Sequence, residues 1–135
     1  MKNNIKSVVL IDDDFAINYF HKRLFLKLEL GVNVFTFSNS NAALDGIIKL
    51  EDTHSESDLV YVFLDINMPD VDGWAFLEKF KKINELIKFE VKIFILSSSI
   101  NPEDVEKAKN NNLVTNYFAK PLMMDGILAI KEMYS

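Results

Sequence analysis

The sequence predicts an α/β fold in which five parallel strands form a doubly wound sheet. Short apolar runs rich in Val, Ile and Phe alternate with segments whose apolar residues recur at helical spacing, so the order β-α is repeated five times. The runs are nearly continuous, which is typical of parallel strands covered on both faces and joined by right-handed helical crossovers. A (β/α)₈ barrel needs roughly 250 residues, so an open sheet is expected for 135 residues.

Five buried strands are predicted from these runs. The first four are strongly apolar, and three of those four are bounded by acidic or Ser/Asn clusters, which favour turns. The fifth run is weaker. The predicted strands are residues 7–11, 32–37, 59–64, 91–96 and 115–119.

Five helices are predicted between and after the strands. In the first three, apolar residues at steps of three and four form one stripe. The fourth begins at Asn101, an N-cap residue, with Pro102 at the first helical position and Glu103 and Asp104 near the positive end of the helix dipole. The fifth runs from about residue 123 to 133. The stripes are Ile17, Phe20, Leu24 and Leu28 in the first helix, Ala43, Ile47 and Leu50 in the second, and Trp74, Leu77 and either Phe80 or Lys81 in the third.

The chain is predicted to form a single domain over residues 1–135. A chain of this length buries roughly two-thirds of its unfolded surface, which is enough for one core. The polar residues 51–58 are interpreted as an exposed loop and not as a linker, because neither flanking part could fold alone. The last predicted helix reaches the end of the sequence and leaves no room in it for a second domain.

Composition excludes several classes of function. The net charge of −5 argues against broad electrostatic binding to nucleic acid or anionic lipid, which needs a basic face. The absence of cysteine excludes disulfides, thiolate catalysis and zinc–thiolate sites. No apolar run approaches the roughly 20 residues that span a bilayer, and the run near the amino terminus is too short for a signal peptide. A cytoplasmic protein is expected.

Polar residues follow four of the five predicted strands. Residues 12–14 are three aspartates after the first strand, and Asp65 and Asn67 follow the third. Three serines, residues 97–99, follow the fourth strand, and Lys120 follows the fifth. In open α/β sheets, ligands bind outside the carboxyl ends of the strands, where the strand order reverses. These side chains are therefore expected to share one cleft.

Such a cluster favours metal-assisted phosphoryl transfer. Two like charges 4 Å apart cost about 4 kcal/mol at an effective dielectric constant near 20, so the carboxylates must hold protons or bind a cation. Oxygen ligands without His or Cys select Mg²⁺, Mn²⁺ or Ca²⁺. A lysine and a hydroxyl facing the same point would supply donors to a phosphoryl group.

Each of these residues also has an ordinary interpretation. The aspartates at 12–14 could cap the following helix, and Asp65 could serve a turn. The serines at 97–99 could satisfy loop backbone, and Lys120 could be a solvated surface residue. Their combination favours the functional interpretation over the ordinary ones, because four of five strand ends carry the residues that a single site needs.

The same residues carry a resemblance to a known family. LIDDD (residues 10–14), LDINMPDVDG (residues 64–73) and Lys120-Pro121 resemble the motifs of the CheY-like receiver domain of response regulators in two-component signal transduction. LDINMPDVDG matches the family's phosphorylation-site signature, D-x-x-M-P-x-x-x-G. The resemblance covers nearly the whole chain and implies a flavodoxin-like fold with strand order 2-1-3-4-5.

The resemblance also implies a set of site residues. Asp65 would be the phosphoryl acceptor, forming an aspartyl phosphate. Asp13 would bind Mg²⁺ (or Mn²⁺) directly, with Asp12 acting through water and Asn67 through its backbone carbonyl. Because Asp14 lengthens the acidic run, which two of the three aspartates line the pocket is left open.

Three further features belong to the implied switch. Lys120 would pair with the phosphoryl oxygens, and Ser97, where Thr is commoner in the family, would hydrogen-bond to one of them. Tyr117 stands at the family's aromatic switch position. The bond between Lys120 and Pro121 is expected to be cis.

The implied partners are a sensor histidine kinase or a histidine phosphotransfer protein, and a downstream protein that binds the face formed by the fourth helix, fifth strand and fifth helix. Kinase docking is expected on the first helix, at Phe20, His21, Arg23 and Leu24, where His21 is interpreted as an ordinary surface residue. The protein is expected to be a stand-alone response regulator without an output domain. It would be a phosphoacceptor switch that phosphorylates and dephosphorylates itself with magnesium, not an enzyme in the usual sense.

Two other functions share parts of this pattern. Asp12 and Asp14 also form a D-x-D motif, which resembles the nucleophile and acid/base of haloacid-dehalogenase-type phosphatases. Ala16, standing where Thr or Val is expected, and the lack of a late acidic pair count against this. The other is a receiver-like binding module that is no longer phosphorylated, and the intact set of Asp65, Ser97 and Lys120 counts against that.

Overall fold

A computed structural model describes residues 4–68, 72–98 and 101–134 as one α/β unit. Five parallel strands form one sheet in the order β2-β1-β3-β4-β5, which confirms the predicted order. The strands are β1 (Asn4–Ile11), β2 (Asn33–Phe37), β3 (Asp58–Asp65), β4 (Glu90–Ser97) and β5 (Val114–Ala119). The helices are α1 (Phe15–Lys27), α2 (Ser40–Lys49), α3 (Gly73–Asn84), α4 (Pro102–Lys109) and α5 (Met124–Tyr134), with a short 3₁₀ helix at Leu50–Asp52.

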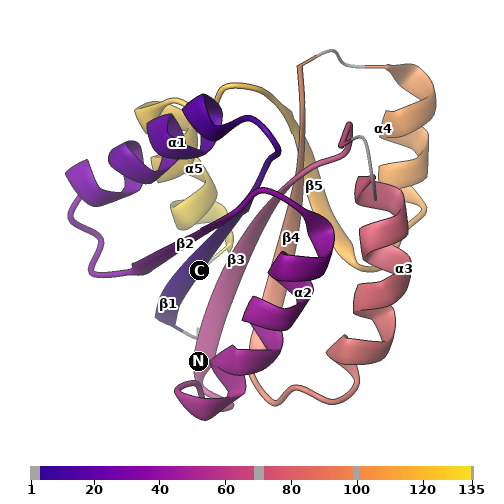
Figure 1. The fold of residues 1–135 in the computed structure, drawn as a ribbon. Coiled ribbons are helices and arrows are strands. Elements are labelled where there is room, and N and C mark those ends of the chain that lie inside the picture. Colours follow the sequence, from indigo (N-terminus) through magenta and orange to yellow (C-terminus); the bar gives the residue numbers. More distant parts are fainter. Residues whose placement is uncertain (1–3, 69–71, 99–100, 135) are drawn as a thin grey trace.

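The helices cover both faces of the sheet. Helices α1 and α5 lie on one face, and α2, α3 and α4 lie on the other (Figure 1). Successive residues of β1 therefore enter two different cores: Val9 and Ile11 pack toward α2 and α3, and Val8 and Leu10 pack toward α1 and α5. Because β1 and β3 are buried on both sides, their sequences are almost continuously apolar.

The sheet register brings the carboxyl ends of the central strands to one edge. Strand β1 pairs with both β2 and β3, and Ile11 is opposite Phe37 on one side and Leu64 on the other. Strand order reverses between β1 and β3, since the chain goes from β1 outward to β2 and then back across to β3. The edge beside these two strands is the place where ligands bind in doubly wound sheets.

Side-chain caps fix where the helices begin. Asp14 accepts hydrogen bonds from the backbone N–H groups of Ala16 and Ile17 at the start of α1. At α4 the predicted signal is confirmed: Asn101 is the N-cap, its Oδ1 accepts from the Glu103 N–H at 2.8 Å, and Pro102 is the first helical residue.

Two predictions about burial are wrong. On α1, Phe20 is exposed, and the buried residues are Asn18, His21 and Phe25, because the two polar side chains find hydrogen-bond partners inside the protein. The segment at residues 51–58 is only partly an exposed loop. His54 is buried within it, where its Nε2 lies 2.8 Å from Ser7 Oγ and its Nδ1 lies 2.9 Å from Thr53 Oγ1.

The choice left open on α3 is resolved by the structure. Phe80 is buried and Lys81 is exposed, so the stripe of α3 follows Phe76, Leu77 and Phe80. Within the described ranges of the chain, no helix is both long and apolar enough to cross a membrane.

Candidate functional site

The predicted site residues lie at the carboxyl edge of the sheet. Asp12 follows β1 directly, Asp65 is the last residue of β3, Ser97 is the last residue of β4, and Lys120 follows β5. Asp12, Asp65 and Ser97 are buried, with exposed fractions of 3%, 2% and 0%. Buried carboxylates need partners that compensate for lost hydration, so this edge is built around its charges.

Three carboxylates converge there. Asp12, Asp13 and Asp65 each offer an oxygen within 4.8 Å of the others. Asp14 has a different task, because its Oδ1 accepts from the first-turn N–H groups of α1. The pair beside Asp65 is therefore Asp12 and Asp13. The same cap counts against the phosphatase interpretation, which needs Asp14 as an acid/base.

Lys120 is the cation facing this cluster. Its Nζ lies 2.9 Å from Asp12 Oδ2, where it donates a hydrogen bond, and 3.6 Å from Asp65 Oδ2. Burial alone would lower the pKa of Lys120, but its hydrogen bonds to and charge interactions with Asp12 and Asp65 outweigh burial and raise it. Lys120 is therefore charged, and it bridges two carboxylates from different strands.

The electrostatics of Asp65 leave the site short of positive charge. Burial raises the pKa of Asp65, and the negative charges of Asp12 and Asp13 act in the same direction, against the Asn67 N–H and Lys120. Among the described residues of this cluster, three carboxylates and one ammonium leave an excess of two negative charges when all are ionised. All the donors are hard oxygens, so the residues fit Mg²⁺ or a similar divalent cation.

The loops that carry the carboxylates are held by their own backbone. Asp12 Oδ1 accepts from the Asp14 N–H at 2.9 Å, and Asp65 Oδ1 accepts from the Asn67 N–H at 3.1 Å. Beyond Asn67, the Gly73 N–H donates to the Ile66 carbonyl at 3.1 Å. A Cβ on Gly73 would lie 2.7 Å from the Ile66 Cα, so only glycine permits this close return of the chain.

Ser97 and Tyr117 occupy the neighbouring strands. The Ser97 carbonyl accepts from the Lys120 N–H at 2.8 Å, so the end of β4 also holds the residue after β5. Tyr117 lies on β5 against the core under α2 and α3. Its phenol oxygen is buried and has no hydrogen-bond partner within the described parts of the chain. The peptide bond between Lys120 and Pro121 is cis, as predicted.

Parts of two motifs lie outside the described residues. These are Pro69, Asp70 and Val71 of the LDINMPDVDG stretch and Ser99 of the serine run. Ser98 is described and exposed.

Sequence reasoning missed two polar residues beside the site. The interpretation of His21 as a surface residue is wrong: it is 1% exposed, and its Nε2 accepts a hydrogen bond from the Leu122 N–H at 3.0 Å. Burial lowers the pKa of His21 to about 4, so the ring is neutral at pH 7. Asn18 donates from Nδ2 to the carbonyls of Asp12 at 2.9 Å and Phe37 at 3.1 Å.

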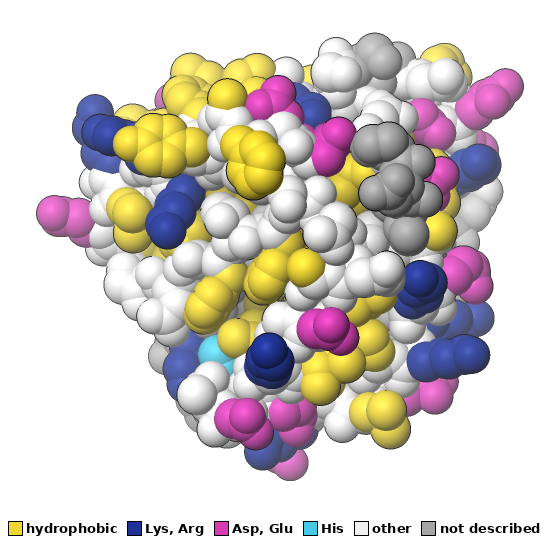
Figure 2. Space-filling view, in the orientation of Figure 1, with side chains coloured by type: hydrophobic (Ala, Val, Ile, Leu, Met, Phe, Trp, Pro, Cys, Tyr) yellow, Lys and Arg dark blue, Asp and Glu magenta, His cyan; other side chains and the backbone are white. Residues whose placement is uncertain are grey.

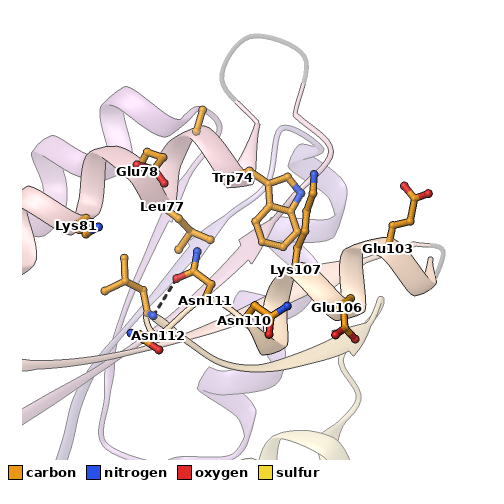
Figure 3. Close-up of a pocket in the computed structure, with 12 residues that line it drawn as sticks. Trp74, Leu77, Glu78, Lys81, Glu103, Glu106, Lys107, Asn110, Asn111 and Asn112 are labelled. Carbon is orange, nitrogen blue, oxygen red and sulfur yellow. Dashed lines mark hydrogen bonds between the residues drawn. The ribbon is translucent and has the colours of Figure 1, made fainter.

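A separate groove of about 970 Å³ lies between α3 and α4. In Figure 3, Trp74 from α3 faces Lys107 from α4 across it, and the Lys107 Nζ lies 5.5 Å from the centre of the indole ring. Glu78, Glu103 and Glu106 also line the groove. None of the predicted site residues belongs to its lining, so it is a feature distinct from the carboxylate cluster.

Hydrophobic side chains gather over α1, at the upper left of Figure 2. Phe15 and Tyr19 are 77% and 61% exposed. Arg23 donates to the Tyr19 hydroxyl at 3.1 Å and lies over its ring. This surface is adjacent to the aspartates, because Phe15 directly follows Asp14.

The architecture and the carboxylate cluster together define a flavodoxin-like α/β protein of the CheY type. Residues 8–132 match the response regulator receiver domain, and the chain belongs to this family, which acts in two-component systems. Sequence and structure thus agree on the class of protein.

Two relatives and a solved structure are similar to the chain over most of its length. The chain is 27% identical over 122 residues to the sporulation initiation phosphotransferase F of Bacillus subtilis (strain 168), a match covering 90% of this chain and 87% of that protein. It is 27% identical over 120 residues to the probable methanogenesis regulatory protein FilR2 of Methanothrix harundinacea (strain 6Ac), with 89% and 75% covered. A two-component response regulator from Cytophaga hutchinsonii superposes with a TM-score of 0.82 at 26% identity, covering 99% of this chain and 98% of that one.

Proposed function

We propose that this protein is a phosphorylation-controlled switch in which Asp65 accepts a phosphoryl group from a phosphohistidine of a sensor kinase or phosphotransfer protein. The observation that carries the proposal is the arrangement of Asp65 with Asp12, Asp13 and Lys120. The three aspartates each offer a carboxylate oxygen within 4.8 Å of the others, and Lys120 Nζ is 3.6 Å from Asp65 Oδ2. In the transfer, the P–N bond of the donor breaks, a P–O bond to an Asp65 oxygen forms, and the imidazole leaves.

Each residue has a defined part in the reaction. Asp12, Asp13 and Asp65 would hold a Mg²⁺ ion, which when bound neutralises their charge and that of the incoming phosphoryl group. Lys120 stabilises negative charge on the phosphoryl oxygens, because its ammonium is already aimed at Asp65 and needs little reorganisation. Most of the rate enhancement comes from positioning and from charge stabilisation within the domain itself.

The phosphoryl group then shifts a conformational equilibrium. Ser97, at the end of β4, donates its hydroxyl to a phosphoryl oxygen, and Lys120 pairs with another. Tyr117, on the neighbouring strand β5, moves together with Ser97. This movement changes the surface formed by α4, β5 and α5. Moving a population from 1:99 to 99:1 requires a difference of about 5.5 kcal/mol between the states. A few charge-assisted hydrogen bonds supply an energy of that order.

The protein acts in the cytoplasm and binds its partners through two surfaces. The donor protein docks on α1, where Phe20 and Arg23 are exposed and His21, being buried, takes no part. The downstream target binds the α4-β5-α5 face, where Met123 and Met133 are 55% and 69% exposed. A groove of about 350 Å³ between β5 and α5 lies on that face.

The test is phosphorylation of the purified protein by acetyl phosphate and Mg²⁺, resolved on a phosphate-affinity gel. A magnesium-dependent shifted band is expected for the wild type and for Asp45→Asn, which changes an exposed aspartate on α2. The band should be absent in Asp65→Asn. The second measurement is binding of beryllofluoride, a phosphoryl mimic. It tests the site even if the protein does not accept a phosphoryl group from small donors such as acetyl phosphate.

The second candidate is a receiver-like module that binds its partner without phosphorylation. One observation favours this candidate: the aromatic side chain of Tyr117 already points inward, with its phenol oxygen buried. Failure of both acetyl phosphate and beryllofluoride to act on the wild type would overturn phosphorylation at Asp65 and leave this module as the function.

A further inference from the structure

The loop between β5 and α5, residues 120–123, carries Lys120 and is anchored on both sides of it. On one side, the Lys120 N–H donates to the Ser97 carbonyl at 2.8 Å. On the other, the Leu122 N–H donates to His21 Nε2 at 3.0 Å, and the Leu122 side chain is buried. The second anchor is a side chain from α1, 101 residues earlier in the chain.

His21 is suited to this one hydrogen bond. The imidazole is 1% exposed, and its Nε2 must carry a lone pair to accept from the Leu122 N–H. A buried backbone N–H that loses its acceptor has no water to replace it, and its loss destabilises the conformation that buries it. An apolar side chain of similar size would fill the space but would leave Leu122 without this acceptor.

One helical turn earlier, α1 makes a matching contact with the acidic loop. Asn18 Nδ2 donates to the Asp12 carbonyl at 2.9 Å and to the Phe37 carbonyl at 3.1 Å. Helix α1 therefore holds Asp12 through Asn18 and the loop that carries Lys120 through His21. Because a helix is stiff over one turn, these two contacts fix the backbones of Asp12 and of the Lys120 loop relative to each other. Between these backbones, Lys120 Nζ lies 2.9 Å from Asp12 Oδ2.

We propose that His21 is a positioning residue for phosphoryl transfer: its hydrogen bond to the Leu122 N–H sets the β5–α5 loop so that the Lys120 ammonium faces Asp12 and Asp65. This role rests on the proposed function of Asp65. His21 touches neither the phosphoryl group nor the carboxylates and acts only through the loop.

The role has a signature that general damage to the site lacks. The Lys120 ammonium attracts a phosphoryl group but repels a divalent cation bound by the carboxylates beside it. If the loop is released, phosphoryl binding should weaken while Mg²⁺ binding stays the same or tightens. A site whose carboxylates were themselves displaced would lose both.

The experiment compares wild type with His21→Leu, which removes the acceptor, and His21→Gln, whose amide oxygen can replace Nε2. The matched controls are His54→Leu and His54→Gln. His54 is the other histidine of the chain and is also buried and hydrogen-bonded, but it contacts Ser7 and Thr53, away from the carboxyl edge of the sheet. For each variant, melting temperature, phosphorylation rate with acetyl phosphate, beryllofluoride affinity, Mg²⁺ affinity and hydrogen exchange of the Leu122 amide are measured.

In His21→Leu, the phosphorylation rate and beryllofluoride affinity should fall about tenfold, with Mg²⁺ affinity unchanged or higher and the Leu122 amide exchanging faster. That tenfold loss corresponds to about 1.4 kcal/mol. His21→Gln should recover most of the rate, and both His54 variants should phosphorylate like the wild type.

Three results would overturn the role of His21. These are a wild-type rate in folded His21→Leu, equal losses in His21→Leu and His21→Gln, or a parallel loss of Mg²⁺ affinity. If the wild type itself takes neither acetyl phosphate nor beryllofluoride, the proposed function fails. The loop contact is then decided by Leu122 exchange and by the NMR signals of the Lys120 methylenes in the metal-free variants, and unchanged signals would refute it.

Discussion

Lys120 and Asp12, 108 residues apart in the chain, form an ion pair with 2.9 Å between Nζ and Oδ2. The pair closes the carboxyl edge of the sheet, since Asp12 follows β1 and Lys120 follows β5. Both side chains are largely buried, 13% and 4% exposed. Their partnership therefore has consequences for stability, for metal affinity and for phosphorylation.

Replacing Lys120 by Met should separate these three effects. Without the ammonium, the buried carboxylates lose their cation, and the free energy of unfolding in metal-free buffer should fall by about 3 kcal/mol. The affinity for Mg²⁺ should rise by about tenfold or more, because a repelling charge is removed. Phosphorylation by acetyl phosphate should slow by about a hundredfold. Urea unfolding with and without Mg²⁺, together with calorimetric titration, measures all three.

The control is Lys92→Met, which removes a half-buried lysine whose partner in the ion pair, Glu90, is exposed. Surface ion pairs contribute about 0–1 kcal/mol, so this variant should unfold and bind Mg²⁺ nearly like the wild type. A weaker Mg²⁺ affinity in Lys120→Met would contradict the assignment of Asp12, Asp13 and Asp65 as the metal ligands.

Buried His21 should make stability depend on pH between about 4 and 6.5. Burial lowers its folded-state pKa from 6.5 to about 4, so in that window the unfolded chain binds a proton that the folded chain does not. Stability is then fully present above pH 6.5 and is lost as the pH falls. The loss reaches about 3 kcal/mol near pH 4. Denaturant unfolding at a series of pH values measures it.

His21→Leu isolates this contribution from the rest of the protein. Burial also lowers the pKa of His54, but His54 is present in both proteins. The free energy of unfolding of the variant should therefore fall less steeply than that of the wild type below pH 6.5. Parallel curves would mean that folding does not lower the pKa of His21.

Much of the fold and of the site could be predicted because both depend on local patterns. Strands β1, β3 and β4 are buried on both faces, so their apolar runs are nearly continuous and end where the polar site begins. Asp65 could be identified because it is the first polar residue after such a run, and Lys120 because it follows the weaker fifth run within a Lys-Pro pair. The edge of a parallel sheet then brings them together.

The polar interior could not be predicted in the same way. His21 and His54 are buried because each meets a partner far away in the chain, the Leu122 N–H for one and the Ser7 hydroxyl for the other. The residues around each histidine do not predict such a distant partner, and a histidine among charged neighbours is usually exposed. One signal was available: Asn18 and His21 are spaced by three residues, and Phe25 follows His21 by four, which is the spacing of one helix face.

Two glycines in helices should respond oppositely to alanine. A Cβ on Gly46 of α2 would lie 2.2 Å from the Phe37 Cζ, so the ring must move, which should destabilise by about 1–3 kcal/mol. Gly126 of α5 has no atom within 4 Å of such a Cβ, so Gly126→Ala should stabilise by about 0.5–1 kcal/mol through helix propensity. Thermal and urea unfolding measure both. Equal gains would show that Phe37 yields to the methyl group at no cost.

Tyr117→Phe should leave the unphosphorylated protein as stable as the wild type, or more stable by up to about 1 kcal/mol. The Tyr117 hydroxyl is buried without a hydrogen-bond partner in the described residues. Removing it therefore breaks no hydrogen bond and relieves the cost of burying an unpaired polar group. Tyr134→Phe is the matched control, because the Tyr134 hydroxyl accepts from Asn116 Nδ2 at 2.8 Å, and it should lose about 0.5–1 kcal/mol. Urea unfolding distinguishes the two. A larger loss for Tyr117→Phe would mean that its hydroxyl is already engaged before phosphorylation, and that the switch does not begin from this conformation.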